Sequence, residues 1–177
     1  MEKRDYQDVL LFIGVMSVID LPESLKEKLE SNFGPISIIT EPFDFTFTDY
    51  YVPEMGDGIK RFFISFDRLI CPDRLASVKT ITNALEEEYA QDGNRKINLD
   101  PGIISESNLI LATTKNRSHR IAIGQNLYAE VTLIYQNHGW KSFNWTYADY
   151  RSEIVQREMI EFRRFYLEKM KTSRKQK

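Results

Sequence analysis

The sequence has one cysteine and two histidines among its 177 residues. Cys71 therefore has no partner for an intrachain disulfide, and cysteine usage gives no support for an oxidising compartment, so we expect a cytoplasmic protein. Two histidines, His119 and His138, are too few for a histidine-rich metal centre. The apolar run over residues 9–19 is far shorter than the roughly 20 residues that span a bilayer. Acidic residues before that run argue against a signal peptide, so we expect a buried strand and no membrane segment.

Known chemical motifs are also missing. The sequence contains no phosphate-loop motif, no dinucleotide-binding glycine motif, no zinc-protease motif, no hydrolase nucleophile motif and no paired cysteines. The charge is balanced, with 24 Lys and Arg against 26 Asp and Glu, which gives a net charge of -2. This balance provides no global attraction to nucleic acid or to an anionic membrane. Nucleic acid as a partner is therefore unsupported by net charge, and any site for a polyanion has to be local.

What is present predicts a soluble α+β protein, since 42% of the residues are apolar and 28% are charged. Apolar, β-branched runs predict strands over residues 9–16, 35–40, 61–66 and 95–99. Helical spacing of apolar residues predicts helices between Pro22 and Gly34 and over residues 73–89. The order strand, helix, strand, strand, helix, strand is the split βαβ arrangement of ferredoxin-like folds. The tripeptide at 100–102, Asp-Pro-Gly, predicts a turn after the fourth of these strands.

The second half of the chain predicts an antiparallel extension of the sheet and a C-terminal helix. Three further strands are expected over residues 109–113, 119–123 and 127–135, with a hairpin turn between the last two. An apolar stripe at helical spacing follows, formed by Val155, Met159, Phe162, Tyr166 and Met170. We therefore expect one domain over residues 1–170 that ends in an amphipathic helix, followed by a basic disordered tail over residues 171–177.

The connection over residues 113–120 carries the clearest signal for a ligand. It reads Thr-Thr-Lys-Asn-Arg-Ser-His-Arg and lies between two apolar strands. Lys115 supplies a point charge, Arg117 and Arg120 supply planar guanidinium groups, and the hydroxyl groups supply neutral donors. Such a loop can hold a phosphate or a carboxylate. The alternative is a solvated polar turn, which is the usual role of a charged run.

Glu130 is the single acidic residue in the last of these apolar strands, so it needs a partner. A two-residue hairpin loop places His119, Tyr128 and Glu130 on one side of the sheet, whereas a three-residue loop sets Arg120 opposite Glu130. Two roles stay open for Glu130. It forms a structural ion pair with Arg120 or Lys115, or it acts as a general base or metal ligand beside His119.

Other polar and aromatic segments have a structural and a functional interpretation. Asn98 and Asp100 lie two positions apart and therefore on the same side of a strand, although turn chemistry alone explains the aspartate. The acidic stretch over residues 44–58 lacks the spacing of a calcium loop, so we assign no metal site. The aromatic cluster over residues 140–150 either stacks on nucleic acid bases or, as its large rings favour, belongs to the core.

Five motifs in the same order along the chain resemble the prokaryotic family called domain of unknown function 4416. They are Asp-Tyr-Tyr at 49–51 with Glu-Met-Gly at 54–56, Asn-Leu-Asp-Pro-Gly at 98–102, Ala-Thr-Thr-Lys at 112–115 with Ser-His-Arg-Ile at 118–121, Tyr-Ala-Glu-Val-Thr-Leu at 128–133, and Trp-Thr-Tyr at 145–147 with Asp-Tyr-Arg at 149–151. The resemblance covers residues 11–165 and implies a small cytoplasmic protein without a known reaction. Asn126 departs from the family pattern, which has glycine in the hairpin, but asparagine tolerates a left-handed turn.

Together these patterns predict a site for a phosphorylated small molecule or a nucleotide, which the protein either only binds or also turns over as an enzyme. The candidate acid and base groups are His119, Glu130 and Asp100. The candidate ligand-binding residues are Lys115, Arg117, Arg120, Tyr128 and Asn98. No cofactor is identified. The alternative is a non-catalytic module whose C-terminal helix and basic tail bind a protein or RNA.

Overall fold

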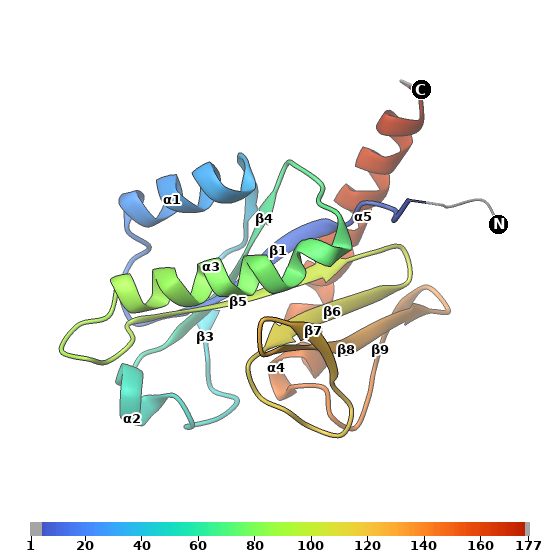
Figure 1. Cartoon of the computed structure of the whole chain (residues 1–177). Coiled ribbons are helices and arrows are strands. Elements are labelled where there is room, and N and C mark those ends of the chain that lie inside the picture. Colours follow the sequence, from blue (N-terminus) through green and yellow to red (C-terminus); the bar gives the residue numbers. More distant parts are fainter. Residues whose placement is uncertain (1–4, 176–177) are drawn as a thin grey trace.

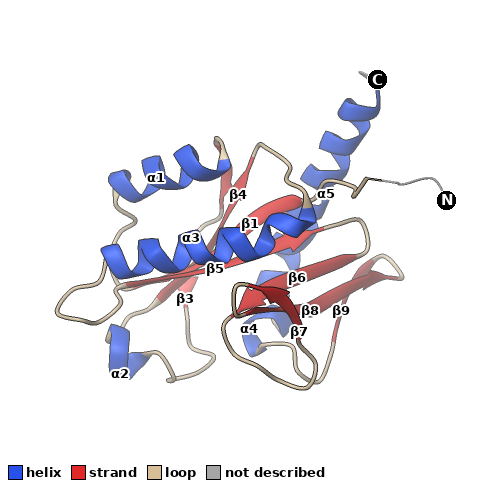
Figure 2. Cartoon of the chain, viewed as in Figure 1, coloured by secondary structure: helices blue, strands red, loops and turns tan. Residues whose placement is uncertain are grey.

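The computed structural model describes residues 5–175, which form one nine-stranded antiparallel sheet and the helices that cover it (Figure 1, Figure 2). In chain order the elements are β1 (Leu10–Ser17), α1 (Glu23–Phe33), β2 (Ile36–Ile39), β3 (Phe43–Asp44), α2 (Val52–Met55), β4 (Lys60–Phe66), the 3-10 turn η1 (Pro72–Arg74), α3 (Leu75–Glu88), β5 (Ile97–Ile104), β6 (Asn108–Thr113), β7 (Ile121–Gly124), β8 (Leu127–Gln136), β9 (Gly139–Ser142), α4 (Ala148–Arg151) and α5 (Glu153–Lys175). The strand order is β2-β4-β1-β5-β6-β8-β7, with β3 beside β4 and β9 beside β8. The α+β class is confirmed.

β1 lies between β4 and β5, and all 8 of its residues are buried. Its continuous apolar run is explained by helices on both faces of the sheet. On one face Leu11, Ile13 and Val15 pack against α1 and α3, and on the other Leu10 and Phe12 pack against α5. Figure 1 shows α1 and α3 together on one side of the sheet and α5 on the other. The sheet is therefore the middle of three layers.

α5 confirms the predicted amphipathic helix. Val155, Met159, Phe162 and Tyr166 are fully buried, so its apolar stripe belongs to the core and is not free for a protein or RNA partner. The helix runs to Lys175 and includes most of the segment predicted as a disordered tail, because no glycine or proline ends it earlier. Residues 176–177 of that predicted tail lie outside the described residues. Among the helices of residues 5–175, none combines the length and apolar character needed to cross a bilayer.

The Asp-Pro-Gly tripeptide lies inside β5 and not in a turn, so that prediction was wrong. β5 pairs with β1 along its whole length, including Asp100, Pro101 and Gly102. A proline is tolerated in a strand where no neighbouring strand needs its N–H for pairing. The β6 side of β5 meets this condition at Pro101, because pairing with β6 begins only at Gly102.

The hairpin between β7 and β8 combines features of both predicted loops. Gln125 and Asn126 have left-handed φ angles of 54° and 57°, as a two-residue turn of this type requires. One additional residue, Ile123, then forms a bulge between two paired positions. The bulge shifts the register by one residue, so Arg120 is level with Glu130, as the longer loop would have produced.

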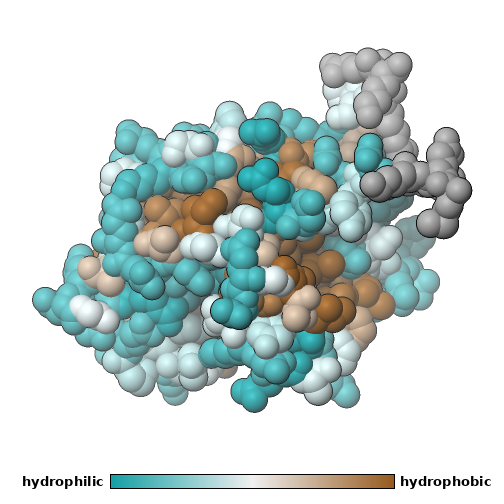
Figure 3. Space-filling view, in the orientation of Figure 1, coloured by the Kyte–Doolittle hydropathy of each residue, from teal (hydrophilic) through white to brown (hydrophobic). Residues whose placement is uncertain are grey.

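Next to the start of α3, the sheet carries an apolar groove of about 340 Å³, whose lining includes Leu75, Ile103, Ile110 and Ile123. Figure 3 shows apolar residues gathered on this face of the molecule. Asp73 is the one charged residue that lines the groove. The groove therefore offers little polar chemistry, unlike the cavity described below.

The lack of a side chain at Gly102 of β5 leaves room for the side chains of Phe12 from β1 and Leu111 from β6. A Cβ atom added there would lie 2.6 Å from the Phe12 ring and 2.7 Å from Leu111. Because overpacking forces side chains and backbone to shift, we expect Gly102→Ala to lower the free energy of unfolding by about 1–3 kcal/mol in urea denaturation. The control is Gly139→Ala, whose Cβ would meet nothing within 4 Å. Equal losses in the two variants would contradict this account.

Candidate functional site

A cavity opens where β5 and β6 separate. The two strands pair only over Gly102–Ile104 of β5. Backbone groups alternate in direction along an antiparallel strand, so Leu99, Pro101 and Ile103 all face the β6 side. Pro101 has no N–H to donate, and pairing with β6 begins only at the next residue. Before that point, the edge of β5 is open.

Side chains of α3 take the place of the missing strand on this edge. Glu86 Oε1 accepts the Leu99 N–H at 2.6 Å, and Lys79 Nζ donates to the Leu99 carbonyl oxygen at 3.0 Å. Both side chains are buried, at 6% and 7% exposure. Buried peptide groups need partners, and these contacts supply them without a strand. The space between β5 and β6 therefore stays open.

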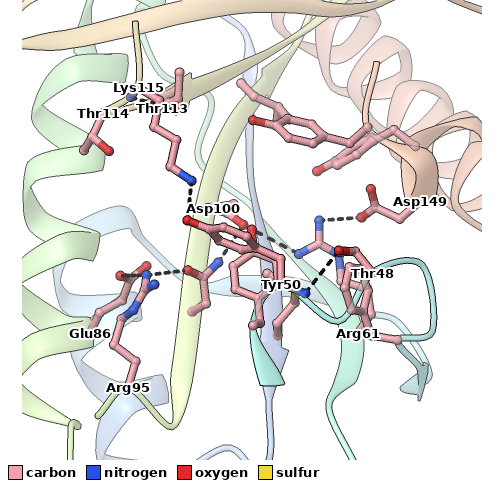
Figure 4. A pocket seen from close by; sticks show the side chains of 18 of the residues that line it. Thr48, Tyr50, Arg61, Glu86, Arg95, Asp100, Thr113, Thr114, Lys115 and Asp149 are labelled. Atoms are coloured by element: carbon pink, nitrogen blue, oxygen red, sulfur yellow. Dashed lines mark hydrogen bonds and ion pairs between the residues drawn. The ribbon is translucent and has the colours of Figure 1, made fainter. Parts of the chain in front are cut away.

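The cavity has a volume of about 720 Å³ and is bounded by α3, β5, β6, the start of α4 and residues 45–51. This volume is typical of small-molecule sites. Figure 4 shows side chains from all these parts of the chain directed toward one space. The floor is buried and charged, whereas the rim is exposed and carries tyrosine, threonine and lysine.

Arg61 of β4 lies on the floor. Its Nη2 is 3.0 Å from Asp149 Oδ2, and its Nη1 is 3.8 Å from Asp100 Oδ2 (Figure 4). The guanidinium lies 4.9 Å from the Phe63 ring centroid and packs on Gly14, where a Cβ would come within 3.0 Å of it. Burial lowers the pKa of Arg61, but nearby negative charges, Asp149 first, outweigh burial and leave the pKa raised. Arg61 is therefore a buried, permanent cation.

Some buried donors on the floor have no hydrogen-bond partner among the described residues. They are Arg61 Nε, Arg61 Nη1 and the Tyr150 hydroxyl group, and both residues line the cavity. Burial raises the pKa of Tyr150 well above its ordinary value, so the hydroxyl keeps its proton. An unpaired buried donor costs about 1–3 kcal/mol. A ligand with acceptor atoms can satisfy these donors.

A chain of polar contacts joins the floor to α2. Asn98 Nδ2 donates to Asp100 Oδ2 at 2.6 Å, and Arg95 Nη1 donates to Asn98 Oδ1 at 2.8 Å. Arg95 also forms two hydrogen bonds to Glu54, at 2.6 and 2.7 Å, and contacts Glu86 at 3.2 Å. The hydrogen bonds with Glu54 are the main cause of the raised pKa of Arg95. This chain orients Asp100 and attaches α2 to the sheet.

Lys115 and Tyr50 meet across the rim. Lys115 Nζ donates to the Tyr50 hydroxyl at 2.9 Å and lies 4.5 Å from its ring centroid (Figure 4). The hydrogen bond from Lys115 lowers the pKa of Tyr50. Thr113 and Thr114 line the cavity beside Lys115. The rim thus gathers one cation and several hydroxyl groups.

The structure brings half of the residues predicted for the site to this cavity. Asn98, Asp100, Lys115 and Glu130 line it. Arg117, His119, Arg120 and Tyr128 do not. Arg117 is exposed on the loop after β6, and Tyr128 lies on β8 level with Ala122 of β7.

Glu130 is occupied by its neighbours. Its Oε2 lies 2.8 Å from Arg120 Nε and 3.0 Å from His119 Nε2, and its Oε1 accepts a hydrogen bond from the Thr132 hydroxyl at 3.2 Å. The Glu130 side chain is 1% exposed. The His119 ring stacks on Trp145, with the ring centroids 5.0 Å apart. Of the two roles left open for Glu130, this geometry favours the structural ion pair.

Four buried charged residues of the cavity were not among the predicted site residues, namely Arg61, Lys79, Glu86 and Asp149. A signal was present for three of them. Arg61 begins an otherwise apolar strand, and Lys79 and Glu86 lie seven residues apart on the buried face of the second predicted helix. Charged side chains on a buried face are rare unless they are paired. Asp149 follows a tyrosine and an alanine in an irregular segment and gave no comparable signal.

Two acidic residues of the stretch over residues 44–58 are paired with cations. Glu54 bonds to Arg95, and Asp44 lies 2.5 Å from Lys60. Within the part of the chain that the structure describes, no group of three or more His, Cys, Asp or Glu side chains is arranged to hold a metal ion.

Residues 7–166 match the family described as Domain of unknown function (DUF4416). The chain belongs to this family. The match includes every element that builds the cavity and confirms the resemblance seen in the five motifs. Searches of curated proteins and of solved structures returned no match. Membership of DUF4416 names no activity, so the function has to be argued from the site.

The contacts of Lys79 predict a large effect of its removal. Lys79→Met leaves the Leu99 carbonyl and the Glu86 carboxylate without their buried cation, so we expect the free energy of unfolding to fall by about 3–5 kcal/mol. Urea denaturation measures this change. The control is Lys26→Met, which removes an exposed ion pair with Glu23 that contributes about 0–1 kcal/mol. A loss at Lys79 as small as the loss at Lys26 would show that the contacts do not support the open edge.

Glu86 predicts a specific dependence of stability on pH. Burial, the largest cause, raises the pKa of Glu86 above its ordinary value of 4.5. The folded state then binds this proton more tightly than the unfolded chain does, so Glu86 makes the free energy of unfolding fall as pH rises from about 4.5 through the raised pKa. In Glu86→Gln this fall is absent. Urea denaturation of both proteins across that range tests the difference, and parallel pH curves would refute it.

Proposed function

We propose that this protein binds a small phosphorylated molecule or a nucleotide in the cavity between β5 and β6. The observation that carries the proposal is that one cavity combines a cationic rim, aromatic walls and buried donors without partners. Cavities of this size that pair apolar walls with a few convergent polar groups are the usual form of small-molecule sites. The features of the rim and of the walls each favour one part of such a ligand.

The rim favours an anionic group. An ammonium group has three donors, and Lys115 uses one of them on Tyr50. The Thr113 hydroxyl oxygen accepts the Lys115 N–H at 3.2 Å, which leaves its own proton free to donate. The Thr114 hydroxyl has no hydrogen-bond partner in the described part of the chain. These donors suit the several acceptor oxygens of a phosphate.

The walls favour a planar group. Residues 45–51 bring several aromatic rings to one side of the cavity. Phe45 lies 5.6 Å from Phe47 and 6.1 Å from Tyr51, and Tyr50 lies 5.0 Å from Tyr51, measured between ring centroids. Aromatic side chains are common stacking surfaces for nucleic acid bases. A nucleotide would use both the rim and the walls.

If the bound molecule is also turned over, Asp100 is the best placed of the three predicted acid and base groups. Its side chain is 29% exposed and lines the cavity. Glu130 also lines the cavity, but Arg120 and His119 occupy its Oε2 and the Thr132 hydroxyl occupies its Oε1. His119 does not line the cavity. A proton transfer to or from the ligand therefore falls to Asp100 in this proposal.

We also infer that the first half of the chain is a ferredoxin-like unit. The strand order β2-β4-β1-β5 supports this, because it is the order of a split βαβ arrangement with α1 and α3 as its helices. Strands β6 to β9 would then be an extension added beside the fourth strand of that unit. The cavity would lie at the junction of the unit and its extension.

Lys115→Ala tests the proposal. We expect the wild type to bind a member of a panel of nucleoside monophosphates and sugar phosphates in titration calorimetry. Loss of a charge-assisted hydrogen bond, about 1.5–3 kcal/mol, should weaken that binding about 10- to 100-fold in Lys115→Ala. The matched control is Arg117→Ala, which removes a cation from the same loop that does not line the cavity. A wild type that binds no phosphate compound, or equal losses in both variants, would defeat the proposal.

A further inference from the structure

We propose that Asp100 determines the specificity of this cavity by accepting a hydrogen bond from an exocyclic amino group of the ligand. The inference rests on the proposed function, because it concerns the inner end of the molecule whose phosphate the rim would hold. It identifies the ligand class as one with an anion at one end and a planar group with amino donors at the other. A nucleotide whose base carries an exocyclic amino group has this form.

Asp100 presents its carboxylate to the cavity more fully than the other acids of the floor do. Its side chain is 29% exposed, whereas that of Glu130 is 1% exposed. The side chains of Glu86 and Asp149 are 6% and 7% exposed. Glu87 also lines the cavity, but it lies on the exposed surface of α3. A group that enters the cavity deeply therefore meets Asp100.

Asp100 also has unused acceptor capacity. In the described part of the chain, Asn98 Nδ2 is its one hydrogen-bond donor, at 2.6 Å. Lys79 Nζ at 3.5 Å and Arg61 Nη1 at 3.8 Å are ion contacts at longer range. An ionised carboxylate accepts about four hydrogen bonds. A ligand N–H therefore finds free lone pairs on a carboxylate that Asn98 holds in position.

The charges around Asp100 fix the orientation of the ligand. Arg61 is paired with Asp149 at 3.0 Å, and Lys79 donates to the Leu99 carbonyl at 3.0 Å. The cations of the floor thus already face a carboxylate or a carbonyl oxygen, whereas Lys115 at the rim uses one of its three donors on the Tyr50 hydroxyl. The phosphate would lie outward, and the amino-bearing group would lie inward.

The remaining groups near Asp100 suit the edge of a nucleobase. The unpartnered Nε and Nη1 of Arg61 can donate to a neutral acceptor such as a ring carbonyl or ring nitrogen. Tyr51 and Tyr147 line the same cavity as Asp100 and provide aromatic surface for a planar ring. Carboxylate side chains accept hydrogen bonds from the amino group of cytosine in known recognition modes.

Matched nucleotides test the inference. Cytidine and uridine 5′-monophosphate differ at the amino group of the base, and guanosine and inosine 5′-monophosphate differ by one amino group. In titration calorimetry, we expect the wild type to bind the amino member of at least one pair roughly 10-fold or more tightly, because a hydrogen bond to a charged acceptor is lost in the other member. In Asp100→Asn this preference should shrink to near equality. The control Glu87→Gln, at another carboxylate of the cavity, should keep it.

The outcomes separate this inference from the proposed function. Equal affinity within both pairs, or a preference for uridine and inosine monophosphate, overturns the inference and leaves phosphate binding standing. If the wild type binds ribose 5-phosphate but none of the four nucleotides, the inference is also overturned and phosphate binding is left standing. A wild type that binds neither ribose 5-phosphate nor any nucleotide defeats the proposed function as well. If circular dichroism shows that Asp100→Asn does not fold, the affinities of the wild type within the two nucleotide pairs decide the test by themselves.

Discussion

The cavity depends on the binding of one residue's backbone by two side chains. Lys79 donates to the carbonyl oxygen of Leu99, and Glu86 accepts its N–H. A central strand has to satisfy its buried N–H and carbonyl groups, and a neighbouring strand normally does so. Here Pro101 ends the pairing of β5 with β6, and two side chains from α3 replace it. The sheet can therefore separate at its middle while the N–H and carbonyl groups of Leu99 keep their partners. The separation forms the space that the polar residues line.

This arrangement explains why charged residues occupy a buried helix face. Apolar side chains at these two positions would pack against β5, and buried ion pairs are often no more stable than apolar replacements. Apolar side chains cannot bind a peptide N–H and a carbonyl oxygen, however. Lys79 also lies 3.5 Å from Asp100, and Glu86 lies 3.2 Å from Arg95, so the residues that support the strand edge also orient the cavity floor. One network of side chains therefore both supports the fold and shapes the site.

The elements that depend on local sequence were predictable. The apolar run of β1, the helical spacing of α1 and α3 and the stripe of α5 each follow from periodicity within one segment. The Asp-Pro-Gly turn was wrong because its local chemistry was outweighed by pairing with β1 on the other side of the strand. The bulge at Ile123 has no local signal, so the partner of Glu130 was left open between two registers.

The site was predictable only in part. The idea that Asn98 and Asp100 share one side of a strand, and that Lys115 follows a strand, correctly identified residues of the cavity. Arg120 and His119 were grouped with them because they are close in sequence, but they contact Glu130 and do not line the cavity. Arg61 and Asp149 lie about half of the chain length apart in the sequence, and only the strand order brings them together. Contacts between residues so far apart in the sequence depend on the topology of the sheet, which local sequence patterns do not reveal.

The wall formed by residues 45–59 is attached in two different ways. Its base is apolar, with Met55 and Ile59 buried against Met16 of β1. Its outer part is fastened by two polar contacts, Tyr50 with Lys115 and Glu54 with Arg95. Loss of either polar contact would therefore loosen the outer part of this wall and leave its apolar base packed.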